Sequence, residues 1–200
     1  MKRMILVLLA VSSAAIASAQ IQFGVKAGYN SATYTVSGTG SSEVNPKSKS
    51  GFSGGALVSV PLFSSCFLQP EIVYSQQGAS FSENGETAKF NYDYLNIPVL
   101  FKFQHESGLF AETGPQIGFL LSGKVEEGGI SVDNKDQSQT TDFSWAFGLG
   151  YKLQDLGLGI DLRYNLGITN VNKPSTDGSS GSDGSVKNSV FQFGLFYMFK

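Results

Sequence analysis

Apolar residues alternate with small or polar residues along much of the chain, most clearly at residues 156–168. The apolar set in this stretch is Leu156, Leu158, Ile160, Leu162, Tyr164, Leu166 and Ile168. The residues between them are Gly157, Gly159, Asp161, Arg163, Asn165 and Gly167. Successive side chains of a β-strand point to opposite faces. The pattern therefore predicts a strand with one apolar face and one small or polar face.

The stretch immediately before it, residues 143–153, alternates in the same way. A two-residue loop at Gln154 and Asp155 would join the two stretches as a β-hairpin, with both apolar sets on one face. The pairs that this hairpin predicts are Leu153 with Leu156, Tyr151 with Leu158, and Trp145 with Tyr164.

The same alternation predicts eight strands in all. They span residues 21–36, 51–62, 66–81, 90–103, 109–123, 141–153, 156–171 and 188–200. The long polar connections are 37–50, 82–89, 124–140 and 172–187, and the short ones are 63–65, 104–108 and 154–155. Consecutive antiparallel strands would then have tight turns at one end and long loops at the other.

The composition of the two faces indicates which one points outward. A soluble barrel needs an apolar interior, and the Gly-rich, charged face could not form an apolar core. An apolar exterior, a polar interior, an even strand number and long loops at one end only are typical of outer-membrane barrels. Closure also satisfies the backbone hydrogen bonds in lipid. The sequence thus predicts an all-β fold, an eight-stranded antiparallel up-and-down transmembrane β-barrel in the bacterial outer membrane.

Aromatic residues near the predicted strand ends suggest two belts at the membrane interfaces. The set toward the turns is Phe63, Phe67, Phe103, Phe110 and Phe199. The set toward the loops is Tyr34, Phe81, Tyr92, Phe143 and Phe191. We expect both sets to face outward.

The first residues have the pattern of an export signal. A basic start, an apolar run at residues 4–16 and a small-x-small motif at residues 17–19 are its three parts. The run is shorter than the roughly 20 residues that a membrane-spanning helix needs. We predict a signal peptide at 1–19, cleavage before Gln20, and a barrel domain at 20–200.

Composition excludes several classes of site. The chain has 24 Gly, 16 Phe and 8 Tyr but only one Cys and one His. A disulfide framework, a thiolate zinc cluster and sites built on several imidazoles are therefore excluded. The formal net charge is -2 at pH 7 and there is no basic stripe, which argues against nucleic acid as a partner. We expect no metal and no cofactor.

Several segments resemble a known family. They are residues 23–30 (FGVKAGYN), 68–78 (LQPEIVYSQQG), 94–102 (YLNIPVLFK), 114–116 (GPQ) and 157–167. These segments resemble the PorT-family outer-membrane β-barrel domain of Bacteroidetes. The resemblance implies an outer-membrane location, contact with lipid, and insertion by the barrel assembly machinery. It implies no catalytic residues, although some relatives take part in type IX secretion or gliding.

With the apolar positions outside, seven charged residues are predicted to point into the lumen. They are Lys26, Glu71, Lys102, Glu112, Lys152, Asp161 and Arg163. An eight-stranded barrel has room for side chains but scarcely for a water channel, and buried charges need partners. We favour a structural polar plug of paired charges; a selective ion path is the alternative.

Other motifs give weaker signals. The motif Gly51-Phe52-Ser53-Gly54-Gly55 matches a nucleophile elbow, which requires a strand, a sharp turn, a helix and a nearby His. Ser53 instead starts a strand after a long loop, and His105 lies in a turn at the opposite end. The Gly/Ser-rich segment 173–185 lacks the spacing of an EF-hand. We expect Cys66, near a turn, to be an unpaired and unreactive thiol.

Two functions from different classes fit these observations. The first is a non-enzymatic outer-membrane protein that anchors, adheres or assembles through its loops, with an unknown protein partner. The second is a narrow channel or small-ligand binder that uses the charged lumen. We favour the first because loops are the large variable surface and the interior is expected to be filled. A barrel enzyme with a carboxylate site is a third and weaker alternative.

Overall fold

The computed structural model describes residues 21–37, 47–83, 86–127, 130–133, 135, 139–170 and 185–199. Nine strands make up most of these residues. They are β1 (Gln22–Ser37), β2 (Lys47–Phe63), β3 (Cys66–Glu83), β4 (Glu86–Gln104), β5 (Leu109–Glu127), β6 (Ile130–Asp133), β7 (Thr141–Lys152), β8 (Leu158–Gly167) and β9 (Ser185–Met198). Within the described ranges, no helix is long and apolar enough to cross a membrane. The predicted signal peptide and its cleavage site lie outside the described residues.

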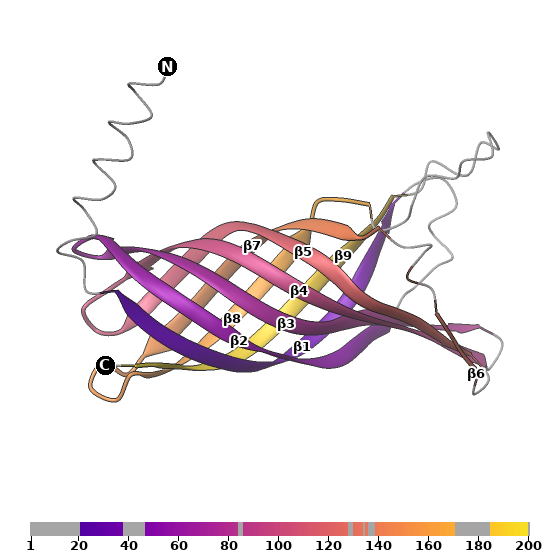
Figure 1. Ribbon diagram of the computed structural model, residues 1–200, viewed down its shortest axis with the longest axis horizontal. Helices are drawn as coiled ribbons and strands as arrows, with labels where there is room; N and C mark the ends of the chain where they lie inside the picture. Colours follow the sequence, from indigo (N-terminus) through magenta and orange to yellow (C-terminus); the bar gives the residue numbers. More distant parts are fainter. Residues whose placement is uncertain are drawn as a thin grey trace, which may run out of the picture.

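Eight of these strands close into a barrel. All pairings are antiparallel, the order is β4-β3-β2-β1-β9-β8-β7-β5, and β4 also pairs with β5. Figure 1 shows the strands wound around a common axis with a strong tilt. The predicted eight-stranded antiparallel barrel is therefore confirmed. The short strand β6 is an addition that the sequence pattern did not indicate, and it pairs with β5 beyond the segment that β7 covers.

Short turns and longer connections lie at opposite ends of the barrel. The turns between β2 and β3, β4 and β5, and β7 and β8 lie at the end where the chain finishes (Figure 1). At the other end, strands extend into two of the predicted loops. Residues 82–89 contain the end of β3 and the start of β4, and residues 124–140 contain the end of β5 and all of β6. The two hairpins continue because each strand has a partner that satisfies its backbone hydrogen bonds.

The hairpin of β7 and β8 has a different register from the predicted one. The connection spans residues 153–157 instead of two residues, and Gly157 has a φ of 70°, which favours glycine. The amide of Gly157 donates to the carbonyl of Leu153 at 2.9 Å. A register change of two residues leaves every side chain on its predicted face. The observed pairs are Tyr151 with Ile160, Phe147 with Tyr164, and Trp145 with Leu166. The predicted pairs, Tyr151 with Leu158 and Trp145 with Tyr164, are therefore wrong.

The two faces of the wall differ as the alternation predicts. Burial along β8 alternates strictly between exposed and buried. The exposed positions of this strand are Leu158, Ile160, Leu162, Tyr164 and Leu166. The buried positions are Gly159, Asp161, Arg163, Asn165 and Gly167. The exterior of the barrel is therefore apolar and its lumen is polar.

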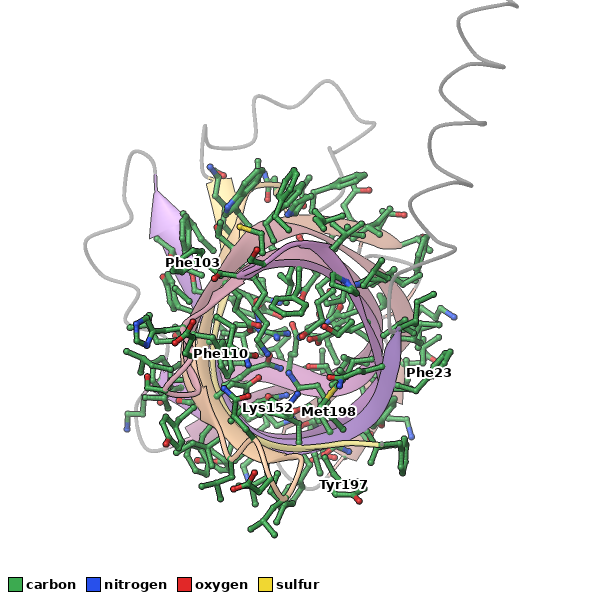
Figure 2. All side chains as sticks on the ribbon, turned by 90° about the vertical axis from the view of Figure 1, so that its left-hand side faces the viewer. Phe23, Phe103, Phe110, Lys152, Tyr197 and Met198 are labelled. Carbon is green, nitrogen blue, oxygen red and sulfur yellow. The ribbon has the colours of Figure 1, made fainter. Side chains whose placement is uncertain are left out.

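The predicted aromatic belts are correct only in part. The outward-facing members include Phe63, Phe103, Phe143, Phe191 and Phe199. Phe110, Tyr34 and Tyr92 are instead buried inside the barrel, and Phe81 packs against the inward group that contains the two tyrosines. Figure 2, viewed from the turn end, shows Phe103 on the outside and Phe110 inside. Strand alternation explains the error, since Phe110 shares the face of Glu112, two residues away.

Candidate functional site in the lumen

A single arginine connects three walls of the barrel. Arg163 of β8 forms two parallel hydrogen bonds with Glu71 of β3, from Nη1 to Oε2 and from Nη2 to Oε1, each 2.9 Å long. It also donates to Oε1 of Glu112 on β5, from Nη2 at 2.6 Å and from Nε at 3.0 Å. The planar guanidinium suits this arrangement because its N–H donors lie in a fixed fork.

Lys26 of β1 adds a second cation to the same cluster. Its Nζ donates to Oδ2 of Asp161 at 2.8 Å and to Oε2 of Glu71 at 3.4 Å. Asp161 also lies 3.6 Å from Nη2 of Arg163. We call Lys26, Glu71, Glu112, Asp161 and Arg163 the ion-pair layer. It links β1, β3, β5 and β8 across the lumen.

The ion-pair layer is almost fully removed from solvent. Arg163 is 1% exposed and Glu71 is 2% exposed. Charges buried to this degree are tolerated when they have opposite partners and hydrogen bonds. The layer contains two cations and three carboxylates, and the buried Lys102 supplies the third cation of the interior.

Glycines provide the room for these side chains. A Cβ atom on Gly148 would lie 2.8 Å from Cγ of Glu112, and one on Gly194 would collide with the carboxylate of Asp161. Other inward glycines face aromatic rings in the same way, Gly150 beside Phe110 and Gly159 beside Phe196.

Two of the seven predicted lumen residues lie outside the ion-pair layer. Lys102 of β4 is buried, but its Nζ donates to the amide oxygen of Gln69 at 3.3 Å and lies 3.6 Å from the ring centroid of Phe110. Lys152 of β7 is half-buried near the turn end, and it donates to Oε1 of Gln22 at 3.0 Å. The structure thus brings five of the seven together and places the two others nearer the turns.

A second polar layer, of neutral side chains, was missed in the sequence. Asn30 donates to Oγ of Ser75 at 2.9 Å and accepts from Nε2 of Gln192 at 2.9 Å. Gln77 donates to Ser75 at 2.9 Å and accepts from Asn188. We call these five residues the amide layer. They occupy inward positions of β1, β3 and β9 and could have been found by the same alternation that revealed the charges.

Apolar groups line the lumen on both sides of the polar layers. Toward the turns, Phe110 and Phe196 pack edge to face at 5.9 Å, with Leu57 and Met198 beside them. Toward the loops, the buried group consists of Tyr34, Ala79, Tyr92, Tyr94 and Leu120. Neither group was predicted from the sequence.

The weaker motifs do not assemble into a reactive site. Ser53 is a buried residue within β2, which begins four residues earlier than predicted, at Lys47. His105 lies in the exposed turn between β4 and β5, where its ring contacts Ser107 at 3.0 Å. Cys66 is a free thiol at the start of β3. The described part of the chain holds no group of three or more His, Cys, Asp or Glu that could bind a metal ion. The segment 173–185 lies outside the described residues.

The barrel is similar to several solved outer-membrane proteins. Neisserial surface protein A has a TM-score of 0.55 at 18% identity, covering 88% of this chain and 97% of that protein. OprG from Pseudomonas aeruginosa has a TM-score of 0.49 at 10% identity, covering 89% and 95%. Ail, the attachment invasion locus protein of Yersinia pestis, has a TM-score of 0.46 at 18% identity, covering 89% and 98%. At these identities the similarity concerns the fold alone.

No curated protein is significantly similar to this chain in sequence. The family comparison is more informative, because a family model covers most of the chain. This model describes the outer membrane protein beta-barrel domain, and it matches residues 13–173. The match agrees with the closed barrel and its apolar exterior. The chain therefore belongs to the outer membrane protein beta-barrel domain family, whose members lie in the bacterial outer membrane.

Proposed function

We propose that the protein is a non-enzymatic outer-membrane barrel with a plugged interior that acts through its extracellular loops in anchoring, adhesion or assembly. The ion-pair layer carries this proposal. Arg163, Glu71 and Glu112 meet in the lumen with almost no exposed surface, which supports an interior without a continuous aqueous path at this level. The loop end is then the large surface free to meet a partner.

The finer parts of the proposal come from the sequence. Short turns mark the periplasmic end and long connections the extracellular end. The assignment to the PorT family, export by a signal peptide at residues 1–19 and insertion by the barrel assembly machinery are parts of the same proposal. The partners are outer-membrane lipid and an unknown protein, and nucleic acid is not among them.

A narrow channel or small-ligand-binding barrel is the second candidate. Four buried side-chain atoms among the described residues have no hydrogen-bond partner, namely Oε2 of Glu112, both amide atoms of Asn165, and Oδ1 of Asn188. Buried polar atoms usually bind either protein groups or ordered water. Water beside these atoms would give the lumen some hydration, which favours this candidate.

Conductance separates the two candidates. The full chain is folded into liposomes, its insertion is checked by heat-modifiability on gels, and the liposomes are fused with a planar bilayer. We expect a silent bilayer, because the ion-pair layer blocks the lumen. Discrete, ion-selective steps would overturn the plug and support the channel.

The role of the loops has its own test. Residues 38–46 and 171–184 are each replaced by a short Asn-Gly turn, and surface attachment of bacteria that express the protein is compared with that of the parent. We expect heat-modifiability to persist and attachment to fall. Equal attachment by the two proteins would contradict a function carried by these loops.

A further inference from the structure

A polar cavity lies inside the turn end of the barrel, separate from the ion-pair layer. Its volume is about 240 Å³. This is below the 300 to 1,000 Å³ typical of sites for drug-sized ligands, so it fits a small chemical group. Seven hydrogen-bonding side chains line it, namely Gln22, Ser59, Gln69, Gln104, Gln154, Lys102 and Lys152. Figure 2 looks into this end and shows Lys152 and Met198 on the inner side.

The cavity has cations but no carboxylate among its lining residues. Lys102 donates to the amide oxygen of Gln69, and Lys152 donates to the amide oxygen of Gln22. None of the ion pairs found in the described ranges includes either lysine. A neutral amide oxygen is a weaker acceptor for an ammonium group than a carboxylate. Both lysines therefore retain capacity for an anion.

The neighbouring groups keep the nearby carboxylates away from the cavity. Gln69 donates to Oε1 of Glu71 at 2.8 Å, which turns its amide oxygen toward Lys102. Glu112 pairs with Lys102 in the sheet register, but its carboxylate is held by Arg163. The turn acids Glu106 and Asp155 are exposed and do not line the cavity.

The charge balance indicates how many negative charges the cavity takes. In the ion-pair layer and beside the cavity, the buried charges Lys26, Lys102 and Arg163 balance Glu71, Glu112 and Asp161. The other buried carboxylate in the described ranges, Asp142, lies at the loop end of β7, where it accepts from Thr169. Lys152 adds one positive charge at the cavity. A ligand with a single negative charge balances this excess, whereas a dianion leaves a surplus negative charge beside the ion-pair layer.

We propose that this cavity binds the carboxylate group of a small monovalent organic anion or of a peptide C-terminus. Lys152 donates to one carboxylate oxygen, and glutamine amides donate to the other. Lys102 stabilises the anion from the inner wall, where the rings of Phe110 and Phe196 hold its ammonium group at 3.6 and 5.0 Å from their centroids. The site is independent of whether the lumen conducts.

The test follows the side-chain amide signals of the glutamines by NMR, with the full chain in zwitterionic micelles. The probe is sodium acetate, with sodium chloride at the same ionic strength as the reference. We expect saturable shifts with acetate only. Lys152→Gln should weaken acetate binding by about tenfold or more, the effect of one charge-assisted hydrogen bond. Lys187→Gln, at the opposite end of the barrel, is the matched control and should bind acetate like the parent.

Two further probes distinguish the sources of the carboxylate. A dipeptide with a free C-terminus that displaces acetate, while its C-terminal amide does not, identifies a peptide end as ligand. Binding of acetate without displacement by either dipeptide identifies a free small acid, and both results support the site. Equal shifts with chloride, no saturation with acetate, or unchanged affinity in Lys152→Gln would overturn it. Because Lys152 is half-buried near the turns, its replacement leaves the ion-pair layer intact.

Discussion

Two polar layers cross the same lumen, and they hold the strands together by different means. In the ion-pair layer, Arg163 contacts the carboxylates of two other strands, and Lys26 contacts Asp161 and Glu71. In the amide layer, Asn30, Ser75 and Gln192 form neutral hydrogen bonds of about the same length. Both layers are buried, and Asn30 and Arg163 each connect three strands, so the difference lies in the charge.

This difference determines how each layer responds to damage. Removal of one charged partner leaves a buried charge without compensation, which is costly in a medium of low dielectric constant. Removal of one amide leaves neutral groups unpaired, which costs less. The ion-pair layer should therefore behave as one coupled unit, and the amide layer as a set of local contacts.

The largest effect is expected for Arg163→Ala. The substitution leaves Glu71 and Glu112 buried with fewer partners, and should reduce the free energy of unfolding by about 3 to 5 kcal/mol. Urea titration of the protein folded in liposomes measures the change. A loss below about 1 kcal/mol would mean that water solvates these carboxylates and that the layer is no plug.

A double-mutant cycle sharpens this result. Arg163→Ala combined with Glu112→Ala should cost less than the sum of the single changes, because the second substitution removes a carboxylate that the first left unpaired. Corresponding cycles with Glu71 and Asp161 test the rest of the layer. Strict additivity in all three cycles would contradict a coupled network.

The next largest effect concerns the opposite side of the same wall. Leu162→Arg places an arginine one residue from Arg163 but facing lipid, where the described structure offers no carboxylate partner among its exposed neighbours on β7 and β9, Leu149 and Phe193. The expected loss is about 2 to 4 kcal/mol, measured by the same titration. Leu162→Ala is the control for lost apolar surface. Equal stability of the two variants would mean that the outer face is not in lipid.

The charged layer was accessible from the sequence because it rests on alternation alone. Once Leu162 and Leu166 are assigned to the outside, Asp161 and Arg163 must point inward. The two-residue register error at Gln154 and Asp155 did not matter for this assignment, since it preserves the face of every side chain. Which charges actually meet depends on strand tilt and on distances across the lumen, and alternation contains neither.

The missed features have physical reasons of the same kind. Phe110 and Tyr34 were assigned to the belts by their position near strand ends. Each nevertheless lies an even number of residues from an inward side chain on its own strand, Glu112 and Asn30 respectively, and therefore shares its face. The amide layer consists of Asn, Gln and Ser, residue types that are also common in loops and on exposed faces. A further missed feature is a bulge in β5, where one extra residue lies opposite β4. Tyr94 pairs with Leu120, and the preceding residue Asp93 pairs with Ser122. No local pattern in the sequence marks the residue between them.

A smaller effect is expected in the amide layer itself. Asn30→Ala removes the amide group that donates to Ser75 and to the carbonyl of Gln76 and that accepts from Gln192. The cost should be about 1 to 3 kcal/mol, that of leaving neutral buried groups unpaired. Added salt should not change this cost. A cost equal to that of Arg163→Ala would contradict the distinction between the two layers. Unfolding of both variants at two salt concentrations provides the comparison.

The smallest effect is expected at Asn165, two residues from Arg163 on the inner face of β8. Asn165 is 2% exposed, and neither of its amide atoms has a hydrogen-bond partner within the described structure. Asn165→Ser removes an unsatisfied group and leaves only a small void beside Ala146 and Val190, its neighbours on β7 and β9. The two effects oppose each other, so the change in unfolding free energy should stay below about 1 kcal/mol. If urea titration instead shows a loss as large as that of Asn30→Ala, the amide of Asn165 must already be hydrogen-bonded to water. The lumen would then be hydrated at Asn165, and the channel would become the better description of this barrel.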